Sequence, residues 1–151
     1  MRYHVLRREQ VLPAPPEEVF PFFADAHNLE AITPPWLGFR VLTPRPVEMR
    51  PGALIEYRLR LRGIPLAWLT RIAEWVPGVR FVDEQLSGPY RLWHHTHDFE
   101  PAGAGGTLMR DTVRYALPGW PLGEVAHALV VRRDLEAIFD HRRDAVAAGL
   151  S

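Results

Sequence analysis

The stretch Phe81–Leu117, FVDEQLSGPYRLWHHTHDFEPAGAGGTLMRDTVRYAL, decides the fold. It contains three runs in which apolar and polar residues alternate, separated by Ser87–Pro89 and by the glycine-rich segment Pro101–Gly106. Alternation with a period of two is typical of strands, and glycine and proline at the breaks are typical of turns. We therefore predict an antiparallel meander over this stretch.

The two faces of this meander differ in an informative way. One face is charged or polar and suits water: Arg80, Glu84, Arg91, His94, Arg110, Thr112 and Arg114. The other face carries the apolar residues Phe81, Trp93, Phe99, Met109, Val113 and Tyr115, and with them Asp83, Gln85, His95, His97 and Asp111. Buried polar groups are costly unless they are paired or wetted, so this face predicts a lined cavity rather than a dry core.

Periodicity and turn residues predict the remaining elements. Proline and glycine pairs separate the segments, and Glu17 and Glu18 place negative charge at the start of a short apolar helix. The predicted strands are residues 3–12, 36–43, 53–62 and 66–76, with turns at Gly63–Pro65 and Pro77–Gly78, and the two short helices reach Ala24 and Ile32.

The C-terminal segment from Leu122 to Ala148 predicts one long helix. Its apolar stripe recurs at spacings of three and four: Ala128, Val131, Leu135, Ile138, Arg142 and Ala145. About 25 helical residues span ~38 Å, so the helix must lie across the whole sheet to bury this stripe. We predict a single α+β domain, residues 1–151, in which a curved antiparallel sheet of about seven strands packs around this helix as a two-layer sandwich.

Composition excludes several classes of function. The net charge is zero with neutral histidines, so sequence-independent electrostatic binding to nucleic acid phosphates is not expected. Cysteine is absent, which excludes disulfides, thiol nucleophiles and thiolate metal sites. Neither a signal peptide nor a membrane span is expected, because no apolar run approaches 18 residues. We expect a cytoplasmic protein.

Four stretches resemble one known family: Asn28–Leu37 (NLEAITPPWL), Gly88–Phe99 (GPYRLWHHTHDF), Gly106–Asp111 (GTLMRD) and Ile138–Arg143 (IFDHRR). Together with the order of elements over the whole chain, they resemble the START-like (SRPBCC) superfamily with the helix-grip fold of the birch-pollen allergen. This superfamily includes lipid and hormone carriers, aromatase/cyclases, dehydratases and chaperone-activating domains, so the resemblance does not specify a reaction. It implies a hydrophobic cavity between the sheet and the C-terminal helix, entered near the short helices.

His95 and His97 form an H-x-H pair on one strand face, with Asp83 or Asp111 on flanking strands. Three interpretations are open: a satisfied polar network, general acid–base catalysis in which a carboxylate orients the histidine, or a metal site. A spacing of two residues is a weak metal signal, and relatives generally bind no structural metal. We therefore expect no metal and no cofactor, and take His95, His97 and Asp111 as the candidate catalytic residues.

The candidate ligand-binding residues combine aromatic walls with polar groups: Tyr57, Trp68, Phe81, Asp83, Gln85, Trp93, Phe99, Tyr115 and Arg142. An aromatic set of this kind serves a core as readily as a ligand pocket. Arg142 has two interpretations, since it either snorkels at the helix end or reaches into the cavity to pair with an aspartate. His127 either overhangs the cavity mouth or lies on the surface.

The function predicted from these observations is binding of a small hydrophobic molecule that is aromatic, polyketide-like or lipid-like. The alternative is a cofactor-free polyketide cyclase or dehydratase that uses a His–Asp pair in the cavity, and a protein-interaction module is a third class. Binding predicts an internal cavity of several hundred Å³. The sequence leaves ligand identity and oligomeric state open, with a homodimer among the options.

Overall fold

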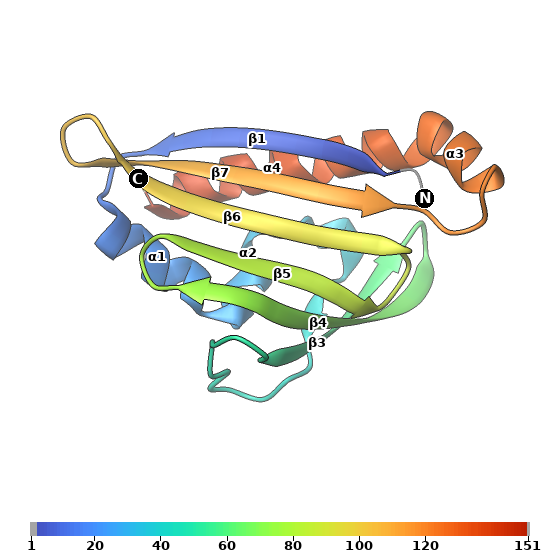
Figure 1. Ribbon diagram of the computed structural model, residues 1–151, viewed down its shortest axis with the longest axis horizontal. Helices are drawn as coiled ribbons and strands as arrows, with labels where there is room; N and C mark the ends of the chain where they lie inside the picture. Colours follow the sequence, from blue (N-terminus) through green and yellow to red (C-terminus); the bar gives the residue numbers. More distant parts are fainter. Residues whose placement is uncertain (1–2, 151) are drawn as a thin grey trace.

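The computed structural model describes residues 3–150, so residues 1, 2 and 151 of the predicted domain lie outside the described range (Figure 1). The described strands form one antiparallel sheet in the order β1-β7-β6-β5-β4-β3-β2. Their bounds are β1 (His4–Leu12), β2 (Arg40–Val41), β3 (Leu54–Leu61), β4 (Ile64–Val76), β5 (Arg80–Ser87), β6 (Leu92–Ala102) and β7 (Gly106–Ala116).

The helices cover one face of this sheet. Figure 1 shows the C-terminal helix behind β1 and β7, and the short helices behind the neighbouring strands. Within residues 3–150, no helix combines the length and the apolar character that crossing a membrane requires. The α-helices are α1 (Pro16–Ala24), α2 (Leu29–Ile32), α3 (Leu122–Ala126) and α4 (Arg132–Leu150). The chain also forms 3₁₀ turns at Ala26–Asn28 and Pro35–Leu37 and a π-helical segment at His127–Val131.

The alternation predicted for the meander is confirmed. In β6 and β7 every second residue is buried against the helical layer, and the intervening residues are partly exposed. The long helix packs on this face through Leu135, Phe139 and Val146, which are all buried. The predicted two-layer α+β sandwich is therefore confirmed, with its curved antiparallel sheet against a long C-terminal helix.

Irregular pairing between β4 and β5 bends the sheet. The register shifts between Leu69 and Thr70 and again between Ile72 and Glu74. Bulges of this kind increase the local twist of the bulged strand. The bend therefore falls in the part of the sheet, β3 to β5, whose residues line the space between the two layers.

Two predicted strand boundaries are wrong. Ile64 and Pro65 belong to β4 rather than to the turn, because Arg62 and Gly63 both have positive φ and form a two-residue hairpin loop. The strand predicted for residues 36–43 is reduced to β2, because Pro34 and Pro35 start a 3₁₀ turn. That turn ends at Gly38, which has φ 54°.

The long helix is also less regular than predicted. The chain is helical from Leu122 to Leu150, but the π-helical segment His127–Val131 interrupts the α-helical hydrogen-bonding pattern. Such segments shift the following residues around the helix axis and occur frequently at functional sites. A strict period of 3.6 therefore does not describe the first turns of this helix.

Neighbouring residues of β1 test which side of the sheet holds the core. Leu12 is 1% exposed and packs between α1 and β7, whereas Val11 beside it is 68% exposed. We expect Leu12→Ala to lower the free energy of unfolding by about 2–5 kcal/mol. The matched change Val11→Ala should cost less than about 0.5 kcal/mol. Urea denaturation measures both, and equal losses would contradict this assignment of faces.

Candidate functional site

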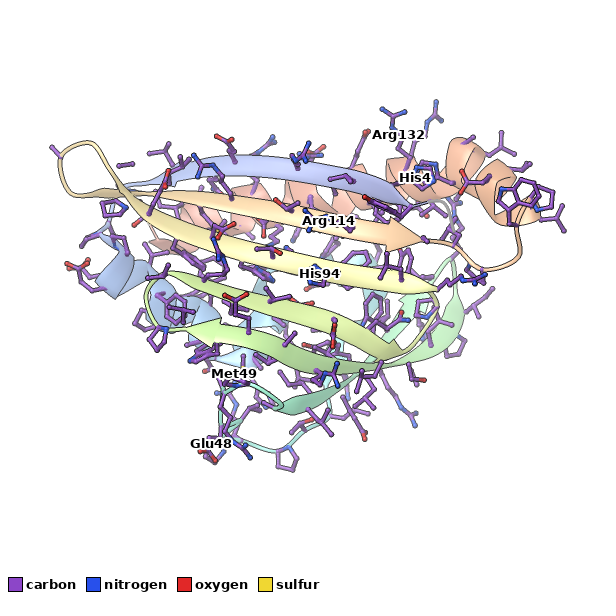
Figure 2. All side chains as sticks on the ribbon, viewed as in Figure 1. His4, Glu48, Met49, His94, Arg114 and Arg132 are labelled. Carbon is purple, nitrogen blue, oxygen red and sulfur yellow. The ribbon has the colours of Figure 1, made fainter. Side chains whose placement is uncertain are left out.

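Strand pairing brings the predicted polar residues together on the concave face. Asp83 of β5 lies opposite His95 of β6, and His97 of β6 lies opposite Asp111 of β7. His94, the residue before His95, lies on the other face of the sheet near Arg114 (Figure 2). The alternation of the meander therefore sorts the adjacent histidines of one strand between the interior and the outer face.

The hydrogen bonds run diagonally rather than straight across. His95 Nε2 lies 2.7 Å from Asp111 Oδ1, and His97 Nε2 lies 2.5 Å from Asp83 Oδ2. The two imidazole rings stack with centroids 3.6 Å apart, and Phe81 stacks on the other side of His97 at 3.9 Å. Each histidine is thus held by at least one carboxylate and by ring contacts, which leaves it little rotational freedom.

Arg142 of α4 completes this cluster. Its Nη2 atom lies 3.7 Å from Asp111 Oδ1 and 3.4 Å from His97 Nδ1. The guanidinium sits 5.8 Å from the ring centroids of both Phe23 and Phe139, and the side chain is only 12% exposed. Of the two interpretations of Arg142, the structure shows the inward one, in which it pairs with Asp111.

The two buried histidines differ in their protonation. Burial, together with the charge of His97, lowers the pKa of His95 to about 4, against the influence of Asp83 and Asp111. Burial also acts to lower the pKa of His97, but hydrogen bonds to Asp111 and Asp83 outweigh it and raise that pKa above its ordinary value. His95 is therefore the neutral member of the pair, and His97 is the one that holds a proton more readily.

Both carboxyl groups remain ionised. Burial acts to raise the pKa of Asp83, but the histidines His95 and His97 lower it below its ordinary value. Burial opposes ionisation of Asp111 as well, yet the charge of Arg142 and the hydrogen bonds of both histidines hold its pKa well below the usual range. The cluster therefore contains two negative charges next to one permanent positive charge.

A cavity of about 160 Å³ lies between the bent strands and the helices, and the polar cluster forms one side of it. It is smaller than the several hundred Å³ that the sequence analysis expected, because aromatic side chains fill much of the space. The polar part of its wall consists of Thr33, Thr70, Asp83, His95, His97 and Arg142, and the aromatic part of Phe23, Phe39, Tyr57, Trp68, Phe81, Tyr90, Trp93 and Phe139.

Eight of the residues predicted from the sequence line this cavity: Tyr57, Trp68, Phe81, Asp83, Trp93, His95, His97 and Arg142. Asp111 lies behind the histidines and borders a separate recess next to β1 and α4. Its contacts with His95, His97 and Arg142 make it a residue that positions the cavity wall.

Three predicted ligand contacts lie elsewhere. The Gln85 side chain makes two hydrogen bonds to the main chain of Tyr90 and so closes the turn between β5 and β6. Phe99 packs in the core cluster that contains Phe20 and Phe23. Tyr115 points to the other end of the long helix, where its hydroxyl lies 2.8 Å from a histidine nitrogen.

That histidine is His127, and neither interpretation made from the sequence describes it. It is buried, it does not line the cavity, and its ring stacks on His4 at a centroid distance of 3.5 Å. Glu124 bonds to His4 Nε2 at 3.1 Å. This second cluster joins the start of β1 to the beginning of the long helix.

Apart from Arg142, the cavity residues that come from outside the sheet were not predicted from the sequence. Leu135 and Ile138 belong to the predicted apolar stripe, so their helix face was known but their exposure to a cavity was not. Leu29 and Met49 come from the short helices and from the proline-rich connection. No periodic signal marks such positions, because loops have no fixed face.

Three buried donors at the cavity have no hydrogen-bond partner within residues 3–150. They are Trp68 Nε1, Thr70 Oγ1 and Arg142 Nε. A buried donor without a partner costs roughly 1–3 kcal/mol. An acceptor inside the cavity would remove this cost.

Residues 12–141 match the family described as polyketide cyclase / dehydrase and lipid transport. The chain belongs to this family. The match covers both the short helices and the strands that carry the polar cluster, and it confirms the START-like resemblance. No curated protein matches the chain.

Solved structures support the same fold. TTHA0849 from Thermus thermophilus is 26% identical, with 98% of this chain and 100% of that chain covered and a TM-score of 0.67. A START superfamily protein from Mycobacterium smegmatis is 12% identical, with 97% of each chain covered and a TM-score of 0.70. The Zhui aromatase/cyclase from Streptomyces sp. R1128 is 16% identical, with 99% of this chain and 94% of that chain covered and a TM-score of 0.70.

The pKa shifts predict different titration of the two buried histidines. In imidazole NMR of the metal-free protein, we expect His95 to stay neutral down to about pH 4. The unfolded chain takes up a proton at that residue near pH 6.5, so His95 destabilises the fold as the pH falls from about 6.5 toward 4. His97 has a raised pKa, so its contribution is full below about pH 6.5 and is lost as the pH rises through its folded pKa. Titration of both rings together near 6.5 would contradict the assignment.

Proposed function

We propose that the protein binds a small aromatic molecule in the cavity between its sheet and its long helix. The observation that carries this proposal is a cavity with aromatic walls on one side and an ordered polar cluster on the other. Ligand sites have this combination, because apolar walls supply affinity and a few placed polar groups supply orientation. The family described as polyketide cyclase / dehydrase and lipid transport supports an apolar ligand.

The volume of the cavity limits the size of the ligand. An apolar cavity of about 150 Å³ accommodates a benzene ring, and the cavity of this protein measures about 160 Å³. A compound of one or two fused rings suits it better than a long lipid chain, which would require the short helices to move. Flat rings also pack well against Trp68 and Trp93, whose own rings meet nearly at right angles.

The polar side of the cavity favours an uncharged ligand with an oxygen acceptor. Asp111 is compensated by Arg142 and by the histidines, and Asp83 by His97, so the cluster does not require a charged ligand. Trp68 Nε1, in contrast, is a donor without a partner among the described residues. A ketone or phenol oxygen would accept its hydrogen bond. Aromatic ketones are therefore our preferred ligand class.

A matched pair of compounds tests this proposal. We expect 1-tetralone to bind more tightly than tetralin, the same skeleton without the ketone, and to quench the tryptophan fluorescence of the cavity wall. Trp68→Phe should weaken tetralone binding about 5- to 12-fold more than it weakens tetralin binding, because only tetralone loses a hydrogen bond worth about 1–1.5 kcal/mol. Fluorescence titration and calorimetry measure both affinities.

Trp36→Phe is the control for this experiment. Trp36 is 61% exposed and does not line the cavity, so its substitution should leave the affinity for both compounds unchanged. Absence of binding by either compound to the wild-type protein would refute the proposed ligand class. Equal losses in the two variants would refute the role of the Trp68 N–H group.

One observation favours acid–base catalysis as a second candidate function. The short hydrogen bond between His97 and Asp83 lies at the cavity wall, so a ligand carbonyl held in the cavity would lie next to a paired histidine and carboxylate. A cyclase or dehydratase needs a proton transfer of this kind and no further group. The proton would pass through the pair formed by His97 Nε2 and Asp83, because His97 Nδ1 faces Asp111 and Arg142 rather than the cavity. Asp111 would fix His95 beside this pair.

Proton exchange tests the catalytic candidate without a known substrate. In D₂O, we expect the wild-type protein to accelerate deuterium uptake at the carbon next to the tetralone carbonyl, as followed by ¹H NMR. His97→Ala should reduce the acceleration by about 100-fold or more, in line with the 10²–10⁴-fold contribution of a positioned acid or base, while tetralone still binds. His94→Ala on the outer face is the control, and equal rates in all three proteins would exclude this function.

A further inference from the structure

We propose that Asp83, His95 and His97 form a binding site for one divalent transition-metal ion at the cavity wall. Asp83 offers a carboxylate oxygen and each histidine offers one ring nitrogen, and these three ligand atoms lie within 4.8 Å of one another. Two imidazoles and one carboxylate on one side of an ion are a ligand set suited to zinc or to ferrous iron.

The distances around Asp83 bracket those of a metal site. Asp83 Oδ2 lies 2.5 Å from His97 Nε2 and 3.7 Å from His95 Nδ1. With metal–ligand bonds of about 2.0–2.2 Å, neighbouring ligand atoms are separated by about 3 Å. Because all three ligand atoms already lie within 4.8 Å of one another, small rotations of these side chains would bring them to that spacing.

The protonation of His95 leaves a nitrogen lone pair in this position. His95 Nε2 donates to Asp111 Oδ1 at 2.7 Å, so in the neutral ring the proton is on Nε2 and the lone pair is on Nδ1. His95 Nδ1 lies 3.7 Å from Asp83 Oδ2, the oxygen that also accepts the hydrogen bond of His97 Nε2. Two electron-rich atoms facing each other repel unless a proton or a cation lies between them, and a bound metal ion would supply the cation.

Asp111 stands where an outer carboxylate is expected. Metal-binding histidines usually donate their second N–H to a carboxylate, which fixes the ring and its tautomer. Asp111 Oδ1 lies 2.7 Å from His95 Nε2 and 3.3 Å from His97 Nδ1, so it reaches both rings on the side away from Asp83. Asp83, His95 and His97 line the cavity, whereas Asp111 lies behind them.

Two consequences follow for the cavity. The ion would be held by three side chains on one side, so its remaining coordination positions would face the cavity, as in catalytic metal sites. With Arg142 beside two carboxylates, a divalent ion would leave one surplus positive charge, which favours an oxygen ligand that is anionic or polarised. This second consequence rests on the proposed binding function, and metal binding itself does not.

Titration of the full chain with Zn²⁺ and Co²⁺ tests the site without any organic ligand. After treatment with a chelator, we expect the protein to bind one equivalent of Zn²⁺ in competition with a chromophoric chelator. Co²⁺ should give visible absorption that differs from that of the aqueous ion. His97→Ala and Asp83→Asn should weaken Zn²⁺ binding by about 100-fold or more, and Asp111→Asn by about 10- to 100-fold, since outer carboxylates contribute that much.

Two control variants separate this site from other histidines. His94→Ala changes the neighbouring histidine on the outer face of β6, and His4→Ala changes the cluster that contains Glu124 and His127. Both should retain Zn²⁺ binding within about twofold. Loss of binding in His4→Ala with retention in His97→Ala would overturn the proposal and assign the metal to the other cluster.

The Co²⁺ absorption and a Zn²⁺-dependent rise in melting temperature are measured on the wild-type protein, so they do not depend on how the variants fold. Absence of both, with no bound equivalent in the competition titration, would overturn the proposal. Tetralone binding is measured separately on the chelator-treated protein. Zn²⁺ binding without tetralone binding would refute the proposed function alone, and the reverse result would refute the metal site alone.

Discussion

Two ionised carboxylates on the concave face of the sheet are the constraint on which the rest of the structure depends. Burying a charge costs several kcal/mol unless partners compensate it. For Asp83 and Asp111 the partners come from β6 and from α4, namely His95, His97 and Arg142. Compensation therefore links the sheet to the long helix. A slip of one residue in the pairing of β6 would turn both histidines outward, which would leave Asp83 without its histidine partners and Asp111 with Arg142 alone.

The polar cluster also divides the interior into two parts. On one side, Leu12, Phe20 and Val146 belong to a tightly packed core between α1 and the sheet. On the other side, the bent strands β3 to β5 leave the cavity, whose walls are mostly aromatic. The packed part keeps the strands and the helix in place, and the open part has the volume for a ligand. The same residues that satisfy the buried charges thus become the polar wall of the cavity.

A second polar cluster holds the opposite end of the long helix. Tyr115 near the end of β7 contacts His127, which stacks on His4 at the start of β1. His127 begins the π-helical segment, so the departure from regular α-helix coincides with the point where the helix is joined to the sheet. This contact explains why Tyr115 lies outside the cavity although its strand position resembles that of Trp93, which lies opposite it.

The sequence by itself determined the α+β class, the order of elements and the face on which the polar residues Asp83, His95, His97 and Asp111 lie, because these follow from periods of two and 3.6 within single segments. Only the tertiary structure decided which histidine bonds to which aspartate, whether Arg142 turns inward, and how large the cavity is. These depend on register between strands and on packing between layers. Register and packing are relations between segments that lie far apart in the sequence, and the periodicity within one segment carries no information about them.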